Sequence, residues 1–179
     1  MDWELIIAAA GFAAVACICA WITVKEEKEA VKTAREFLES QKMRKVYVCS
    51  QYATRGNRET NLEFAKVFCM QVIEEGKLPV CPHLFFGGVL NDDVESQRAA
   101  GLRMGLELLK DCDELRIYSR LSDGVKGEIA EAIRLGIPVS IGNLAYIYSE
   151  DQAAVLEQEI LEDLEEIRIG QEHHTEENR

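Results

Sequence analysis

The chain has 179 residues, enough to bury one ordinary hydrophobic core, so we expect one globular domain with attached segments. Its formal net charge of -12 argues against a protein that binds the phosphate backbone of nucleic acids, so we expect no nucleic-acid polymer as a partner. The acidic residues are concentrated at the end of the chain, where residues 150–179 contain 11 Asp and Glu residues but only two Arg. The remainder is near neutral, which suits a small-molecule site.

Six cysteines lack the spacing of a disulfide framework or of a metal site. Two lie in an apolar run near the start, and the others fall in expected strands, helices or their ends, where cysteine behaves as a small buried hydrophobe. The sequence contains no C-x-x-C pair, and its histidines are His83, His173 and His174. We therefore expect reduced thiols in a cytosolic compartment, no metal and no cofactor.

Residues 5–24 form an apolar run of 20 residues without a charge or a proline. At about 1.5 Å per residue a helix of this length matches the hydrocarbon core of a bilayer. Trp3 and Trp21 lie near the two ends, where amphipathic rings favour the interface. A signal peptide and a buried core helix are the alternatives, but the start is acidic and the run has no polar side. We predict a transmembrane helix.

A charged segment follows this run. It opens with Lys25, Lys28, Lys32 and Arg35, so the positive-inside rule predicts a single-pass membrane protein with its globular domain in the cytoplasm. Residues 25–43 lack Gly and Pro and carry an apolar stripe, which predicts a helical stalk. The stalk leaves a homo-oligomer open, although its seam is too short to predict a coiled coil.

Strands and helices are expected to alternate through residues 44–149. β-Branched and aromatic residues predict strands at 45–50, 78–84, 114–119 and 137–141. A helix follows each of the first three strands, and short loops connect these elements. This alternation predicts parallel βαβ units with right-handed crossovers. We therefore expect an α/β fold, a small doubly wound (flavodoxin-like) parallel sheet of four or five strands.

Helical periodicity also predicts which side chains are buried. The first helix of the domain, which Gly76 should end, presents an apolar stripe. The second, over residues 94–110, presents a similar stripe, and its Gly101 and Gly105 would allow a close approach to a neighbour. The two stripes comprise Leu62, Ala65, Phe68, Cys69, Val72 and Ile73, and then Ala99, Leu102, Leu106 and Leu109.

The end of the chain differs from the domain in composition. Residues 150–169 carry apolar residues at helical spacing with a strongly acidic opposite face, which predicts an acidic amphipathic helix. Residues 170–179 have almost no apolar side chain, and we expect a disordered tail.

In such a sheet the loops that follow the strands converge at one edge, where ligands bind. The third of these helices carries Glu128, expected in its first turn after a loop with Gly124 and Gly127. A carboxylate there can attack an electrophilic sugar carbon, and free N–H groups at the helix start favour its ionised form. The converging loops supply Ser50, Tyr52, Arg55, Asn57 and Arg58, then His83, Asp92 and Asp93, then Ser122, Asp123, Gly124 and Glu128.

Four motifs in this region resemble the nucleoside 2-deoxyribosyltransferase-like superfamily, and most closely its small bacterial and phage branch of DUF4406-type domains. The resemblance covers about residues 44–141. The motifs are V-Y-V-C-S, C-P-H-L-F-F, G-L-x-x-G-L-E-L-L-K-x-C-D-E-L and S-D-G-V-K-G-E-I-A-E-A-x-x-L-G-I-P-V.

The resemblance implies a role for several residues. Glu128 matches the glutamate that attacks the anomeric carbon of the sugar, and Ser122, with Asp123 beside it, matches the position that contacts the sugar hydroxyls. In relatives that act on nucleotides the loop after the first strand binds a 5′-phosphate, which implicates Ser50, Arg55 and Arg58. The C-P-H-L-F-F match implies that His83 lines the site.

Each of these residues also has a purely structural explanation. Glu128 could only stabilise the first turn of its helix, and Asp92 and Asp93 could cap the helix that follows them. His83 could be a satisfied histidine at a strand end, Tyr52 an ordinary loop aromatic, and Arg55 and Arg58 solvated surface residues.

Together these observations predict a membrane-anchored cytoplasmic domain that acts as an N-glycosidase or deoxyribosyltransferase on a nucleoside or nucleotide. One alternative is a module that binds a nucleotide-derived ligand without cleaving it. Another is a membrane-tethered scaffold whose acidic C-terminal helix docks a basic partner.

Overall fold

The computed structural model describes residues 21, 23–33, 36, 42–52 and 58–177. The chain divides into two compact units, Met1–Lys42 and Met43–Arg179. In the first unit residues 21, 23–33 and 36 are helical. Of the predicted membrane helix at 5–24, all but residues 21, 23 and 24 lie outside the described residues. Among the described residues no helix has both the length and the apolar composition to cross a bilayer.

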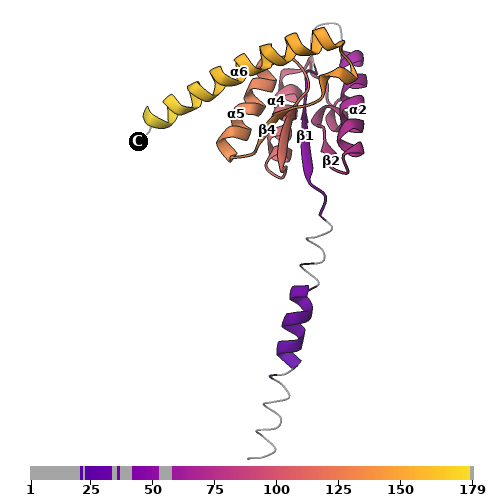
Figure 1. The fold of residues 1–179 in the computed structure, drawn as a ribbon, viewed down its shortest axis with the longest axis vertical. Helices are drawn as coiled ribbons and strands as arrows, with labels where there is room; N and C mark the ends of the chain where they lie inside the picture. Colours follow the sequence, from indigo (N-terminus) through magenta and orange to yellow (C-terminus); the bar gives the residue numbers. More distant parts are fainter. Residues whose placement is uncertain (1–20, 22, 34–35, 37–41, 53–57, 178–179) are drawn as a thin grey trace, which may run out of the picture. The chain divides into compact units, whose positions relative to one another are not determined.

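The second unit is built on a four-stranded parallel sheet (Figure 1). Its strands are β1 (Lys45–Cys49), β2 (Leu78–Val80), β3 (Glu114–Ile117) and β4 (Val139–Ile141), and they lie in the order β2-β1-β3-β4. The central pair aligns Tyr47 with Leu115, and β3 aligns Ile117 with Ile141. This confirms the predicted α/β class and parallel sheet.

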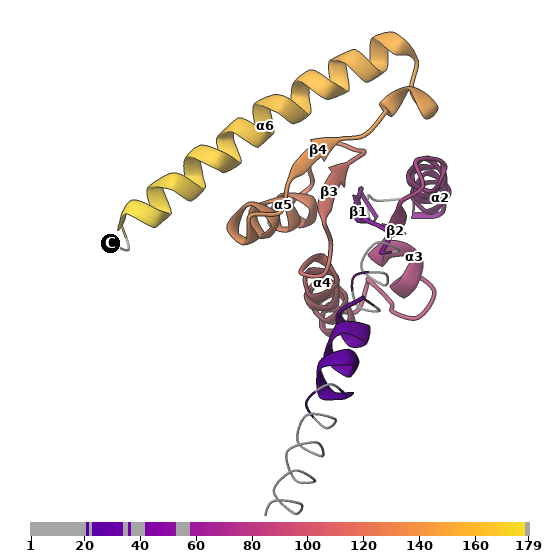
Figure 2. The same ribbon diagram turned by 60° about the horizontal axis from the view of Figure 1, so that its bottom comes forward.

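Helices cover both faces of this sheet (Figure 2). On one face α2 packs against β1 and β2, and on the other α4, α5 and α6 share a hydrophobic cluster with β1 and β3. The helices are α2 (Arg58–Glu74), α3 (Pro82–Phe86), α4 (Glu95–Leu109), α5 (Asp123–Leu135) and α6 (Glu150–Glu177), with a 3-10 turn η1 (Leu144–Tyr146).

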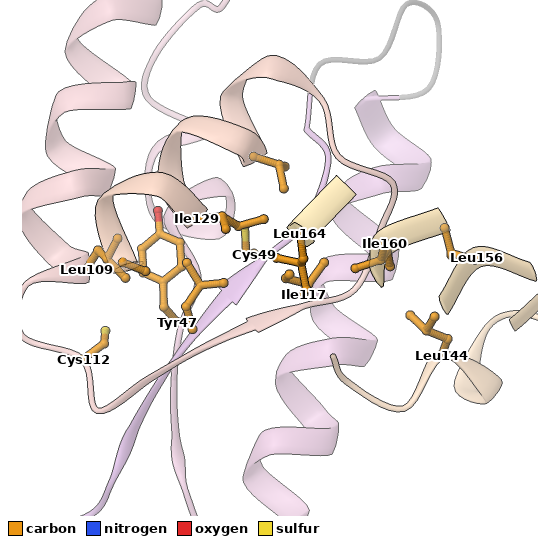
Figure 3. Packing of buried hydrophobic residues seen from close by; sticks show 13 residues of the cluster. Tyr47, Cys49, Leu109, Cys112, Ile117, Ile129, Leu144, Leu156, Ile160 and Leu164 are labelled. Atoms are coloured by element: carbon orange, nitrogen blue, oxygen red, sulfur yellow. The ribbon is translucent and has the colours of Figure 1, made fainter. Parts of the chain in front are cut away.

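Strand β1 is buried on both sides, as expected of a central strand in a parallel sheet. Val46 and Val48 point toward α2 and pack in the cluster that contains Phe68. Tyr47 and Cys49 point to the other face, in the cluster formed with α4 and α5 (Figure 3). Because side chains alternate along a strand, residues 47 and 49 share one face and reach the same neighbours.

The second strand is shorter than predicted, because β2 ends at Val80 and residues 82–86 form helix α3 instead of continuing the strand to 84. Cys81 is extended at the N-cap, and Pro82 occupies the first helical turn. The first N–H groups of a helix have no partner within the helix, so a proline, which has no N–H, is tolerated there. Its fixed φ angle also suits the start of a helix. His83 therefore lies in a helix rather than at a strand end.

The predicted buried stripes are partly wrong. Ile73 is 50 % exposed, and Leu102, which is 45 % exposed, lines the pocket described below. Helix α4 instead approaches the sheet through Gly105, where a Cβ atom would lie 3.1 Å from the Tyr47 hydroxyl oxygen. The predicted close approach at Gly105 is thus confirmed, and Gly76 follows α2 with a positive φ of 73°.

Helix α6 is longer than the predicted acidic helix and continues through Gly170 to Glu177. The predicted boundary at 169 is therefore too early, and the segment 170–177 is helical instead of disordered. A single glycine weakens a helix by about 1 kcal/mol, and the Gln and Glu residues around it favour the helix. The helix is held to the domain by Leu156, Ile160 and Leu164, which are buried.

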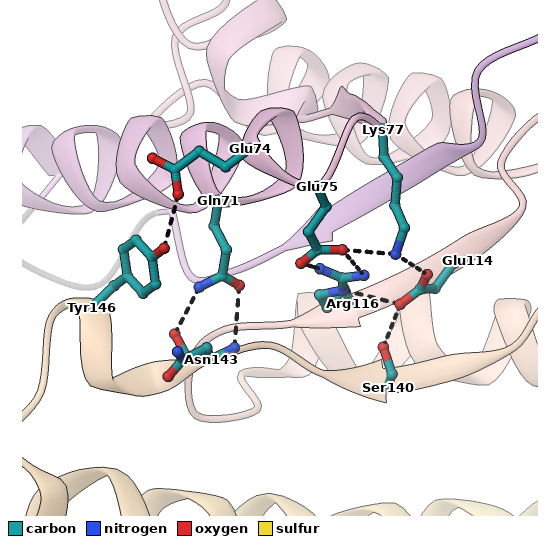
Figure 4. Close-up of polar contacts among 9 residues, drawn as sticks. All are labelled: Gln71, Glu74, Glu75, Lys77, Glu114, Arg116, Ser140, Asn143 and Tyr146. Atoms are coloured by element: carbon teal, nitrogen blue, oxygen red, sulfur yellow. Dashed lines mark hydrogen bonds and ion pairs between the residues drawn. The ribbon is translucent and has the colours of Figure 1, made fainter.

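A polar network ties the end of α2 to β3 and β4 (Figure 4). Arg116 donates two hydrogen bonds to the Glu75 carboxylate, at 2.7 and 3.1 Å, and one to Glu114 at 2.9 Å. Lys77 pairs with both carboxylates, and the Ser140 hydroxyl donates to Glu114 at 2.6 Å. Hydrogen bonds from Arg116 and then Lys77 lower the pKa of Glu75 to about 2. The network links β3 and β4 to the end of α2 through side chains as well as through the sheet.

Candidate active site

A pocket of about 250 Å³ opens at the carboxyl ends of β1, β2 and β3. From the neighbouring strands β1 and β3 the chain continues into helices on opposite faces of the sheet, α2 after β1 and α5 after β3. Open α/β sheets bind their ligands at such a topological switch point. The pocket lining comes from the ends of the strands and from the helices that follow. The residues are Gln51, Tyr52, Pro82, His83, Phe86, Gly87, Leu90, Asp92, Gln97, Arg98, Gly101, Leu102, Ser122, Asp123, Gly124, Val125 and Glu128.

Helix α5 delivers the polar residues on one side of this pocket. Ser122 is its N-cap, and the Ser122 hydroxyl accepts a hydrogen bond from the N–H of Val125 at 3.5 Å. Both Gly124 and Gly127 are helical, so Glu128 lies in the second turn and not, as predicted, in the first turn after a glycine loop. Ser122 and Asp123 are exposed, whereas Glu128 is 8 % exposed.

The Glu128 carboxyl group is held by two side chains of β1. The Tyr47 hydroxyl donates a hydrogen bond to Oε1 at 2.8 Å, and the Cys49 thiol donates one to Oε2 at 3.0 Å. Both donors are fully buried. Each carboxylate oxygen therefore has its own protein donor, one a phenol and the other a thiol.

Burial and hydrogen bonding act on Glu128 in opposite directions. Burial raises the pKa of its carboxyl group, while the hydrogen bonds from Cys49 and Tyr47 oppose that rise without cancelling it. The predicted preference for the ionised form through the helix N-terminus is opposed by desolvation, which is the largest effect on the pKa of this carboxyl group. Burial and the neighbouring Glu128 also raise the pKa of Tyr47 and of Cys49, so both stay protonated and act as donors.

The opposite wall of the pocket is aromatic. The rings of Tyr52 and His83 stack with centroids 5.0 Å apart and an interplanar angle of 15°, and the Tyr52 hydroxyl donates to the Gly87 carbonyl at 3.1 Å. The Arg58 guanidinium group lies over the Tyr52 ring, 5.5 Å from the ring centroid, and forms an ion pair with Asp93 at 3.2 Å. Burial lowers the pKa of His83 to about 4, so its imidazole is neutral at pH 7.

The structure brings most of the predicted site residues together. Glu128, Ser122, Asp123, Gly124, Tyr52 and His83 all line the pocket.

Three of the described residues predicted for the site do not line it. Ser50 is buried beside it, and its hydroxyl has no hydrogen-bond partner among the described residues. Arg58 and Asp93 pair with each other at 3.2 Å, and neither lines the pocket. Arg55 lies outside the described residues.

Of the predicted pair Asp92 and Asp93, Asp92 lines the pocket and Asp93 does not. Gln97 and Arg98, which were not predicted as part of the site, extend the pocket along α4. Tyr47 and Cys49, which hold Glu128, were assigned only to a strand, although their alternate spacing along β1 was the available signal. Among the described residues no three His, Cys, Asp or Glu side chains gather as they would around a metal ion.

Comparison of the chain with curated proteins found no match. Among solved structures, a 2-deoxyribosyltransferase from the psychrotolerant bacterium Bacillus psychrosaccharolyticus is similar, with 18% sequence identity and a TM-score of 0.44 over 54% of this chain and 70% of that chain.

A family match covers the sheet and the pocket. Residues 44–141 match a family described as a domain of unknown function, DUF7768, which differs from the DUF4406-type branch that the motifs resemble. The matched residues begin just before β1, end with β4, and make up more than half of the chain. The chain belongs to the DUF7768 domain family.

Proposed function

We propose that the α/β domain cleaves or transfers the N-glycosidic bond of a nucleoside or nucleotide, with Glu128 as the nucleophile. The observation that carries the proposal is the Glu128 carboxyl group, which lines the pocket and is held on both oxygens by buried donors. A carboxylate fixed in this way attacks a sugar carbon without first losing side-chain freedom. The motif resemblance to nucleoside 2-deoxyribosyltransferases supports the same reading.

The proposed chemistry proceeds in two displacements. An oxygen of the Glu128 carboxylate attacks the anomeric carbon, the bond from that carbon to the base nitrogen breaks, and the nitrogen keeps the electron pair and accepts a proton from solvent water. The product is a glycosyl ester of Glu128. Water, or the nitrogen of a second base, then attacks the same carbon and releases the carboxylate. Two inversions give net retention of configuration.

The other lining residues match the two halves of such a substrate. Ser122 and Asp123 lie at the start of α5, six and five positions before Glu128, and supply a hydroxyl and a carboxylate for sugar hydroxyl groups. The Tyr52–His83 stack supplies a flat apolar wall suited to a planar base. A pocket of about 250 Å³ is close to the lower end of small-molecule sites, at about 300 Å³.

Residues 5–24 complete the proposal as a membrane anchor that leaves the domain in the cytoplasm. The support is their uncharged apolar sequence, followed by lysines. The proposal predicts that the full-length chain sediments with membranes and is released by detergent but not by high salt.

Incubation of the full-length chain, in mild detergent, with nucleosides and 5′-nucleotides tests the proposed activity. We expect release of free base, with a roughly 10³-fold loss of kcat in Glu128→Gln, as for the loss of other nucleophiles. Glu131→Gln is the matched control, because Glu131 lies one turn further along α5 and pairs with Arg134. Turnover by Glu128→Gln equal to that of the wild type would overturn the proposal.

A binding module without catalysis is the second candidate, and one observation favours it. Both Glu128 oxygens are already hydrogen-bonded inside the protein, which is also how a purely structural carboxyl group is satisfied. If nucleosides or nucleotides raise the melting temperature of both wild type and Glu128→Gln, and neither releases base, the binding function replaces the enzymatic one.

A further inference from the structure

The two donors to Glu128 differ in strength, and this difference has a chemical use. A phenol hydroxyl is a full hydrogen-bond donor, whereas a thiol is a weak one. The Tyr47 hydroxyl holds Oε1 at 2.8 Å, and the Cys49 thiol holds Oε2 at 3.0 Å. A strong donor lowers the basicity of the oxygen it binds, and a weak donor leaves that basicity largely intact.

We propose that Cys49 is a positioning residue that orients Glu128 Oε2 while leaving it nucleophilic, so that Oε2 is the oxygen that attacks the sugar. This inference rests on the proposed function and deepens it by assigning different roles to the two oxygens. Tyr47 anchors the carboxyl group through Oε1, and the weaker contact at Oε2 is the one that breaks when the glycosyl ester forms. The thiol keeps its proton throughout and is not consumed.

The surroundings of Cys49 agree with this role. Its side chain is completely buried, in the cluster that also contains Tyr47, Ile117 and Ile129, so it does not contact substrate and acts only through Glu128. Serine would fill the same place with one atom exchanged, and alanine would remove the donor. The position therefore allows the strength of one hydrogen bond to be varied while the packing changes little.

Cys112 provides a matched control. It belongs to the same hydrophobic cluster and is 8 % exposed, but its thiol donates to the Leu108 carbonyl at 3.3 Å and not to a carboxylate. Replacing Cys112 by alanine or serine alters the same cluster without touching Glu128. Any effect that the Cys49 and Cys112 variants share is then a packing effect.

The test compares pH profiles of kcat/KM for the full-length wild type, Cys49→Ala, Cys49→Ser and Cys112→Ala. Without a donor at Oε2 the pKa of Glu128 rises, so the acid limb of Cys49→Ala should move to higher pH. A hydroxyl donates more strongly, so the limb of Cys49→Ser should move to lower pH while its plateau kcat falls about tenfold, equivalent to about 1.4 kcal/mol. Cys112→Ala should keep the wild-type limb.

Coincident limbs for all four proteins would overturn the role of Cys49, even if its variants are less active. A second readout does not need turnover. The ¹³C side-chain carboxyl resonance that disappears in Glu128→Gln reports the titration of Glu128 in wild type and in both Cys49 variants. If that titration shifts in opposite directions but no protein releases base, the positioning contact is real and the proposed glycosidic activity is what fails. If it does not shift, the positioning role fails whatever the activity.

Discussion

The hydroxyl oxygen of Tyr47 lies 2.8 Å from Glu128 Oε1, in a hydrogen bond that joins the middle of β1 to the second turn of α5. The two residues are 81 positions apart in the chain. Cys49, two residues further along β1, completes the contact on the other oxygen. The proposed nucleophile is thus oriented by the central strand of the sheet, and not by the loop that precedes its own helix.

Removing the Tyr47 hydroxyl should therefore affect both stability and the ionisation of Glu128. We expect Tyr47→Phe to lower the free energy of unfolding by about 1–3 kcal/mol, because Glu128 Oε1 is left buried without a partner. It should also raise the pKa of Glu128 and move the acid limb of kcat/KM to higher pH. Urea unfolding and pH profiles measure the two effects. Tyr118→Phe is the control, since that hydroxyl is also buried but is not one of the two donors to Glu128; an equal loss in both variants would contradict the expectation.

His83 should make the stability of the domain depend on pH between about 6.5 and 4. Its pKa is 6.5 when unfolded and about 4 when folded, because burial disfavours the imidazolium. Between these values the unfolded chain binds more protons, so stability falls as pH falls, by up to about 3 kcal/mol. His83→Phe keeps an aromatic ring against Tyr52 and should lack this component. Thermal melts of both proteins from pH 7 to pH 4 check it, and parallel profiles would refute it; Glu128 and Glu75 are present in both proteins, so their own titrations cancel in the comparison.

Two glycine substitutions should have opposite effects. Gly127 lies inside α5, and a Cβ there meets nothing within 4 Å, so Gly127→Ala should stabilise the domain by about 0.5–1 kcal/mol through helix propensity. A Cβ at Gly142, just after β4, would clash with the ring of Tyr118, so Gly142→Ala should destabilise by about 1–3 kcal/mol or more. Chemical denaturation measures both. A stabilised Gly142→Ala would mean that Tyr118 can move aside.

Arg98 should decide how well the pocket accepts a phosphate. It lines the pocket and forms no ion pair with the described residues, whereas Arg58 is paired with Asp93. We expect Arg98→Ala to raise KM for 5′-nucleotides about 10- to 100-fold, equivalent to a charged hydrogen bond of about 1.5–3 kcal/mol, and to leave KM for nucleosides almost unchanged. Arg103→Ala is the control, because Arg103 is on the same helix but does not line the pocket. Equal losses for nucleosides and nucleotides would show that Arg98 does not bind a phosphate.

The alternation of apolar strands and amphipathic helices was sufficient to predict the parallel sheet and the edge at which the pocket lies. Strand and helix periods depend on local residue order, and crossover handedness depends on chain chirality, so both follow from short stretches of sequence. The motif around Ser122 and Glu128 also placed both residues in the pocket correctly.

Errors arose at the end of one strand and in side-chain pairing. Residues 82–84 were predicted as part of a strand, but Pro82 opens helix α3, and His83 of that helix lines the pocket. Arg58 was predicted to lie in the site, but it pairs with Asp93, 35 positions away, and does not line the pocket. Side-chain pairing of this kind has no signature in local periodicity.

Patterns of a few neighbouring residues were enough to predict the class of fold, the parallel sheet and Glu128 as the proposed nucleophile. The environment of the Glu128 carboxyl group, in contrast, depends on the folded chain. Burial of Glu128 raises its pKa, and the opposing donors Tyr47 and Cys49 come from a strand 79 to 81 positions away. Desolvation and hydrogen-bond geometry depend on which groups meet in space, and that is settled only when α5 packs on the sheet.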